Sequence, residues 1–124
     1  MLKHQELTNR IVGAAIEVHR SLGPGLLESV YEECFCFELS ERKLSFTRQL
    51  EVPLLYKGTN LASSLRVDVL VEDTVVVELK SVAAVLPIHE AQLLTYLRLT
   101  KREVGLLINF NVPILKQGIV RRVL

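Results

Sequence analysis

A near-continuous apolar run from Val104 to Phe110 is the feature that most limits how this 124-residue chain can fold. A strand that is apolar on both sides must be covered on both sides, as in a sheet packed between helices. Other segments show either helical spacing of apolar residues or strict alternation with polar ones. The sequence therefore predicts an α/β fold. Its length, and the lack of a repeat or linker, predict one domain over residues 1–124.

The expected elements follow one another in the order ααβββαβ(β), in which the last strand is short. The spacing predicts helices at 3–21, 26–42 and 87–98, and strands at 45–57, 61–72, 74–80, 104–110 and 118–123. The breaker Gly23-Pro24-Gly25 separates the first two helices. Short turns join the first three strands, which predicts an antiparallel meander.

The same patterns assign faces to the helices and strands. The apolar side expected for the second helix consists of Leu27, Val30, Tyr31, Cys34 and Phe37. Glutamates on the other side, Glu32 among them, are expected to face solvent. In the second strand we expect Val67 and Val69 on one face and Asp68 on the other, because side chains alternate along a strand.

A carboxylate and an ammonium stand together in the otherwise apolar strand VVVELK. Glu78 and Lys80 are two residues apart, so both side chains point to one face. Asp68 lies on the preceding strand. Pairing around the turn at Glu72-Asp73 places it opposite Glu78. Two converging carboxylates suit Mg²⁺, and a neighbouring lysine can orient the attacking water and offset developing charge. The plainer alternative is an exposed ion pair, because an acid-x-Lys triplet is common.

Two further segments carry candidate site residues. On the helix at 87–98, Gln92 and Tyr96 are four residues apart and share a face with His89, so they can lie over the sheet. The alternative there is a solvated helix face with a half-buried tyrosine. Glu28 lies in the first turn of the second helix, where the helix dipole favours a carboxylate. It either stabilises that helix or binds a metal or water.

Composition narrows the class of protein. The net charge of +1 provides no overall basic field for attracting nucleic acid. Only short basic clusters could bind phosphates: Arg42, Lys43 and Arg48; Lys101 and Arg102; Arg121 and Arg122. Since the opening MLKHQELTNR is charged and has no apolar core, we do not expect it to act as a signal peptide, and no apolar stretch is long enough to predict a membrane span. The two cysteines, on diverging sides of one helix, predict neither a disulfide nor a metal site, so we expect a cytoplasmic protein.

The motifs together resemble a known family. GLLESVY matches the signature of the small bacterial GxxExxY proteins, and the similarity extends through RVDVLVED, VELKSV, HEAQLLTYL and GLLINFNVP. That family is grouped with the PD-(D/E)XK nuclease superfamily. The resemblance implies a restriction-endonuclease-like αβββαβ core with a mixed sheet flanked by helices, in agreement with the order of elements above.

The resemblance also implies roles for individual residues. Asp68 and Glu78 would bind the metal, Mg²⁺ or Mn²⁺, and Lys80 would be the catalytic lysine. Glu28 would complete the site as a further metal ligand or catalytic acid. Gln92 and Tyr96 match the Gln-x-x-x-Tyr of RecB-like exonucleases and would orient the lysine, the metal water or a substrate phosphate. One departure is Arg66, two residues before Asp68, where some relatives carry Pro-Asp.

These observations lead to a hypothesis and two rivals. The hypothesis is a metal-dependent nuclease that hydrolyses phosphodiester bonds, with DNA expected ahead of RNA as substrate. The first rival is a non-catalytic module that binds nucleic acid or protein on the same fold. The second is a hydrolase of a smaller phosphate ester, which the missing basic surface favours. A homodimer or a protein partner is also expected, because so small a chain has little surface with which to hold a duplex.

Overall fold

The computed structural model describes residues 3–124 and confirms the α/β fold that the periodicity predicts. The helices are α1 (Gln5–Leu22), α2 (Glu28–Glu41) and α3 (Pro87–Thr100), and η1 (Leu115–Gly118) is a short 3-10 turn. The strands are β1 (Phe46–Tyr56), β2 (Thr59–Val71), β3 (Val75–Lys80), β4 (Val104–Asn109) and β5 (Ile119–Val123). Within residues 3–124, none of the helices combines the length and hydrophobicity that a membrane span requires.

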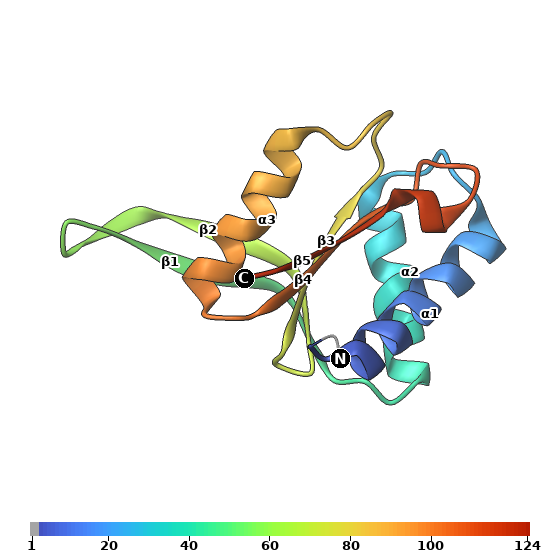
Figure 1. The fold of residues 1–124 in the computed structure, drawn as a ribbon, viewed down its shortest axis with the longest axis horizontal. Helices are drawn as coiled ribbons and strands as arrows, with labels where there is room; N and C mark the ends of the chain where they lie inside the picture. Colours follow the sequence, from blue (N-terminus) through green and yellow to red (C-terminus); the bar gives the residue numbers. More distant parts are fainter. Residues whose placement is uncertain (1–2) are drawn as a thin grey trace.

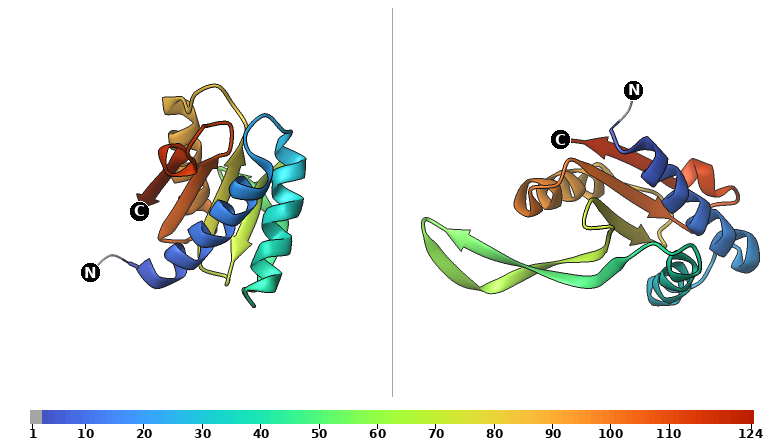
Figure 2. Two further views of the ribbon diagram at one scale, coloured as in Figure 1. Left: turned by 90° about the vertical axis from the view of Figure 1, so that its right-hand side faces the viewer. Right: turned by 90° about the horizontal axis from the view of Figure 1, so that it is seen from below.

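The five strands form one mixed sheet in the order β1-β2-β3-β4-β5. β3 and β4 are parallel, while the other three neighbouring pairs are antiparallel. The parallel pair requires a crossover, which α3 provides. As Figures 1 and 2 show, α1 and α2 cover one face of the sheet and α3 covers the other. The apolar run that forms β4 is therefore buried on both sides, as its sequence predicts.

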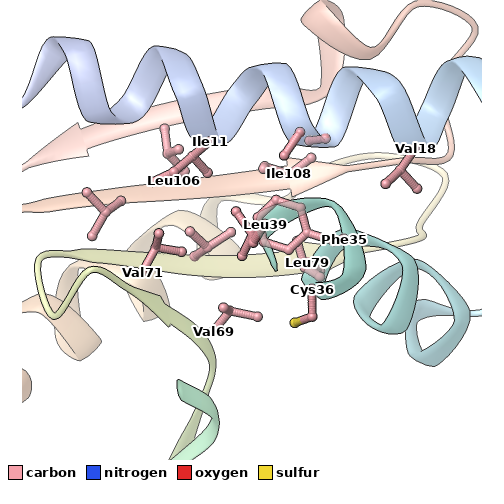
Figure 3. Packing of buried hydrophobic residues seen from close by; sticks show 14 of the residues in the cluster. Ile11, Val18, Phe35, Cys36, Leu39, Val69, Val71, Leu79, Leu106 and Ile108 are labelled. Atoms are coloured by element: carbon pink, nitrogen blue, oxygen red, sulfur yellow. The ribbon is translucent and has the colours of Figure 1, made fainter. Parts of the chain in front are cut away.

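Two apolar clusters hold these layers together. The cluster beneath α1 and α2, part of which is drawn in Figure 3, includes Ile11, Val18, Phe35, Leu39, Val69, Val71, Leu79, Leu106 and Ile108. The cluster beneath α3 consists of Val52, Val67, Leu70, Val76, Leu93, Tyr96, Leu97 and Leu107. Gly105 lets α3 lie close to β4, because a Cβ at that position would be 2.8 Å from Cδ1 of Leu93.

The β1–β2 hairpin is much longer than the other strands and projects beyond the helices as an arm (Figure 2). Its turn is Lys57-Gly58, with φ angles of 49° and 77°. Two consecutive left-handed residues are typical of a type I′ hairpin turn, whose twist matches that of the strands. β1 therefore ends at Tyr56, one residue earlier than predicted, and β2 begins at Thr59, two residues earlier than predicted.

The prediction of one continuous face along β2 was wrong. Val69 belongs to the cluster beneath α1 and α2, whereas Val67 belongs to the cluster beneath α3. The change of face occurs at Asp68. Gln49 of β1 lies opposite Asp68, because the pairs on either side are Arg48 with Val69 and Leu50 with Val67. Gln49 has a φ of 50°, in the left-handed region. The hairpin therefore twists sharply where the candidate metal ligand lies.

Candidate functional site

Asp68 and Glu78 lie where β2 and β3 stop pairing. The antiparallel ladder between these strands contains three residue pairs and ends at Val69 and Val77. Asp68 and Glu78 come next, and they would be opposite each other if the ladder continued. The register predicted from the turn at 72–73 is thus confirmed. Beyond this point β3 stays paired with β4 but no longer with β2. The backbone ladder between β2 and β3 is therefore interrupted at these two carboxylates.

Each carboxylate binds the backbone of the other strand. The N–H of Asp68 donates to Oε2 of Glu78 at 2.7 Å. The N–H of Leu79 donates to Oδ2 of Asp68 at 2.8 Å. Side-chain oxygens thus replace the backbone acceptors that a regular ladder would supply. The two carboxyl groups are held in place on neighbouring strands, each with one oxygen outside these bonds.

Burial makes this pair of carboxylates costly. Glu78 is only 5% exposed. Burial, and then the charge of Asp68, raise the pKa of Glu78 to about 8. Burial also raises the pKa of Asp68, against the opposing effect of the hydrogen bond from Leu79. None of the ion pairs formed by residues 3–124 includes either group. A nearby divalent cation would favour the ionised form of both carboxyl groups.

Lys80 ends β3 on the same side of the strand as Glu78 and is half-buried. Its charge lowers the pKa of both Asp68 and Glu78, although less than burial raises them. The carbonyl of Lys80 accepts a hydrogen bond from the N–H of Phe110 at 2.9 Å. The end of β3 is therefore fixed to the end of β4, and Lys80 lies within electrostatic range of the two carboxylates.

Asn109 was missed by the sequence analysis. This residue ends β4, pairs with Lys80 and is 98% buried. Its Oδ1 accepts a hydrogen bond from the N–H of Val82 at 3.1 Å, and its Nδ2 donates to the carbonyl of Val82 at 3.0 Å. The amide thus holds the chain directly after the acid-x-Lys triplet. A polar residue at the end of an apolar run was the available signal.

Gln92 and Tyr96 lie on α3, as predicted, and bind each other. Nε2 of Gln92 donates to the hydroxyl of Tyr96 at 3.0 Å. Burial raises the pKa of Tyr96, followed by the charges of Glu78 and Asp68, which places this hydroxyl in the electrostatic field of the carboxylates. His89 caps the start of α3 instead. Its Nδ1 accepts a hydrogen bond from the N–H of Leu86 at 3.0 Å.

Glu28 is exposed at the first residue of α2. Its charge is the smallest of the effects that raise the pKa of Asp68, so it lies in the vicinity of the carboxylate pair. Within residues 3–124, no three His, Cys, Asp or Glu side chains are grouped so that they could hold a metal ion. The role of Glu28 as a metal ligand or catalytic residue stays a prediction.

Tyr31, three residues after Glu28 on α2, has a structural role. It is fully buried, and its ring stacks on Phe110 with 4.4 Å between centroids. Its hydroxyl donates to the carbonyl of Gly23 at 2.5 Å and accepts from the N–H of Leu26 at 3.2 Å. Tyr31 therefore fixes the loop that precedes Glu28 instead of joining the site.

The prediction that Glu32 faces solvent was wrong, because this residue is buried. It is 8% exposed, and it forms an ion pair with Arg48 at 3.0 Å. It also accepts a hydrogen bond from Nε2 of Gln49 at 2.7 Å. Its charge raises the pKa of both Asp68 and Glu78. Glu32 thus ties α2 to the twisted part of β1 and adds a third negative charge near the pair.

The arrangement fits a hard divalent cation. Carboxylate oxygens are the ligands that Mg²⁺ prefers, and Mg²⁺ is commonly held by one or two carboxylates while waters and substrate phosphates complete its shell. Asp68 and Glu78 supply two such groups without a cation of their own. Lys80 and the hydroxyl of Tyr96 are hydrogen-bond donors within electrostatic range of both carboxylates. Chemically, this set can place a metal, a water molecule and a phosphate together.

The chain matches one family over nearly its whole length. A model described as the PD-(D/E)XK nuclease superfamily matches residues 5–123. No curated protein and no solved structure matches the chain.

Proposed function

The chain belongs to the PD-(D/E)XK nuclease superfamily, and from this premise we propose that it is a nuclease, dependent on Mg²⁺ or Mn²⁺, that hydrolyses phosphodiester bonds, with DNA favoured over RNA. The observation that carries the proposal is the buried pair Asp68 and Glu78, held by reciprocal hydrogen bonds at the point where β2 and β3 separate. Such a pair adds nothing to a sheet that regular pairing would not supply. It does make a preformed site for a cation.

Asp68 and Glu78 would hold the divalent cation, with Glu28 as a further ligand, direct or through water. The bound cation would supply Lewis-acid polarisation of a phosphoryl oxygen and lower the pKa of a bound water. The burial and the charge of Asp68 that raise the pKa of Glu78 to about 8 support this assignment, because a bound cation would offset both effects and displace the proton of Glu78.

The neighbouring side chains would handle the water and the phosphate. Lys80 would orient the attacking water and offset the negative charge that develops on the phosphate oxygens. Tyr96, held by Gln92, would accept a hydrogen bond from Lys80 or donate its hydroxyl proton to that water or to a phosphate oxygen. The raised pKa of Tyr96 keeps this hydroxyl protonated, and therefore a donor, at neutral pH.

A hydrolase of a smaller phosphate ester is the second candidate, and one observation favours it. Four arginines of the expected phosphate-binding clusters are ion-paired with acidic side chains: Arg42, Arg48, Arg102 and Arg122. Their charge is already compensated, which weakens the case for a long basic track for a nucleic-acid backbone. A small monoester or diester would need only the cation and Lys80.

A cleavage assay tests both candidates. Wild type, Glu78→Gln and the matched control Glu41→Gln, an exposed glutamate at the end of α2, would be given labelled linear and circular DNA, RNA and a chromogenic phosphodiester. Each reaction would contain Mg²⁺, Mn²⁺ or EDTA. We expect cutting of nucleic acid that needs the metal, persists in Glu41→Gln and falls to the EDTA level in Glu78→Gln.

The outcomes separate the candidates. Turnover of the small ester alone would favour the second candidate. No metal-dependent turnover of any substrate by folded wild type would contradict both and leave a binding module. Cutting by Glu78→Gln at the wild-type rate would remove the carboxylate pair from the mechanism.

A further inference from the structure

Helix α2 carries two apolar stripes, and only one of them faces the core. Tyr31, Phe35 and Leu39, four residues apart, are fully buried against the sheet and α1. The second stripe consists of Leu27, Val30, Cys34 and Phe37, at spacings of three, four and three residues. Residues with this spacing line one side of a helix. The apolar side predicted from the sequence joined these four residues to Tyr31. That prediction is confirmed for Tyr31, which is fully buried, and it was wrong for Leu27, Val30 and Phe37, which are exposed.

Three of the four residues of the second stripe are exposed, while Cys34 is partly buried and packs against the core. Leu27, just before the first residue of the helix, is 73% exposed, Val30 is 38% and Phe37 is 62% exposed. An apolar patch of this kind on a folded domain commonly marks an interaction surface. The stripe therefore needs a covering that residues 3–124 do not provide.

A groove runs beside the stripe, between α1 and α2. Its volume is about 340 Å³. It is lined on the α1 side by Glu17, Val18, Ser21 and Leu22, and on the α2 side by Glu33, Cys34, Phe37 and Glu38. A spacing of three and four residues is the pattern with which one helix packs into the groove of another. Since α2 is 14 residues long, it offers room for a partner helix of about 21 Å.

The charge around the groove selects the kind of partner. Three glutamates line it, and none of its lining residues is a lysine or arginine. Arg20 binds Glu17 and Arg42 binds Glu38. Of the three groove glutamates, Glu33 is therefore the one that forms no ion pair with another residue of the range 3–124. Two copies of the chain docked through this groove would bring their uncompensated Glu33 carboxylates to the same interface, which is unfavourable. A basic border on the partner would be complementary.

We propose that the groove between α1 and α2, with the stripe Leu27–Val30–Cys34–Phe37, binds an amphipathic helix of another protein whose apolar side is bordered by lysine or arginine. Phe37 is the central anchor, because it is aromatic, well exposed and lines the groove. Glu33 pairs with a basic residue at the border. No residue that lines the groove belongs to the candidate metal site, so the inference does not depend on the proposed nuclease activity.

Designed peptides test this surface directly. Three labelled helical peptides would be titrated with the full chain and followed by fluorescence anisotropy. The first carries a leucine seam bordered by lysines, the second the same seam bordered by glutamates, and the third has the composition of the first with the leucines spread around the helix. We expect the first to bind at least tenfold more tightly than the other two.

Variants show whether the groove is the binding site. Phe37→Ser should weaken binding of the lysine-bordered peptide at least tenfold, and Glu33→Gln by a smaller factor. The control Ile88→Ser removes an equally exposed apolar side chain on α3, where binding should be unchanged. Because Phe37 and Ile88 are both exposed, circular dichroism should show folded protein in each case.

Several results would overturn the proposal. Equal affinity for the first and third peptides would show attraction by charge alone, and equal affinity for the first and second would rule out the basic border. Undiminished binding to Phe37→Ser would place the peptide elsewhere, and binding of none of the peptides would remove a helical partner. A wild-type dimer in sedimentation that Phe37→Ser dissociates would make a second copy the occupant instead.

Discussion

The two edges of β3 differ in how they are joined to their neighbours. On one side, β3 pairs with β4 over six consecutive residues, from Val75 to Lys80. On the other, its pairing with β2 stops after three residues, and the carboxylates of Asp68 and Glu78 occupy the place of the missing ladder. The first edge is regular, and β4, the neighbouring strand there, has no charged side chain. The second is buried, negatively charged and irregular.

This difference separates stability from function within a single strand. At the β3–β4 edge the pairing is regular, and β4 contributes apolar burial on both faces of the sheet and has no charged side chain. The β2–β3 edge keeps an ionisable pair in an environment that raises both pKa values. A folded domain gains nothing in stability from such a pair. We therefore expect substitutions at the first edge to destabilise the fold, and some substitutions at the second to stabilise it.

The largest effect is expected on the regular edge. Ile108→Ala would remove a fully buried side chain of β4 from the cluster beneath α1 and α2. The lost burial and the remaining cavity should lower the free energy of unfolding by about 2–5 kcal/mol. Urea unfolding checks this value, and Leu99→Ala, an exposed leucine on α3, is the control. A cost below about 1 kcal/mol would show that this edge is not the stable one.

At the irregular edge, between β2 and β3, we expect a substitution to raise the free energy of unfolding. The pKa of Glu78 is about 8 in the folded chain, above its ordinary value of 4.5. Below 4.5 the group is protonated whether the chain is folded or not, so it costs nothing. As the pH rises from 4.5 to 8, only the unfolded chain releases the proton, and stability is progressively lost. The full cost, roughly 3–5 kcal/mol, applies above pH 8.

Glu78→Gln removes this titration and keeps an oxygen that can accept the hydrogen bond from Asp68. Without metal, the variant should match wild type near pH 4 and become more stable than wild type as the pH approaches 8. Thermal unfolding of both proteins in EDTA across this range measures the difference. A wild type that is more stable than the variant at pH 8 would mean that the carboxylate pair supports the fold.

The sequence was sufficient to predict the position of this pair. A short turn fixes the midpoint between two strands, so Asp68 and Glu78 could be placed opposite each other by counting from residue 73. The period of two also put Glu78 and Lys80 on one side of β3 correctly. These deductions succeed because they depend on local geometry alone. The order of the elements followed from the same periodicities.

Other features depend on contacts between distant segments and could not be predicted in this way. Glu32 is buried because Arg48 and Gln49 reach it from β1, and nothing in α2 indicates that. The change of face at Gln49 requires a left-handed residue that is not a glycine, for which the sequence gives no signal. An apolar stripe shows that a helix has a side to bury, but not which of two stripes meets the sheet. That choice misplaced Phe37.

The central claim is that Asp68 and Glu78 bind a divalent cation, and a metal titration tests it most directly. Thermal unfolding of wild type, Glu78→Gln and Glu41→Gln would be followed at pH 8 from EDTA to millimolar Mg²⁺ or Mn²⁺. We predict that wild type and Glu41→Gln are stabilised, by about 2.7 kcal/mol at a hundredfold excess of metal over its Kd, and that Glu78→Gln is not. Equal stabilisation of all three proteins, or none of wild type at any concentration, would contradict the account.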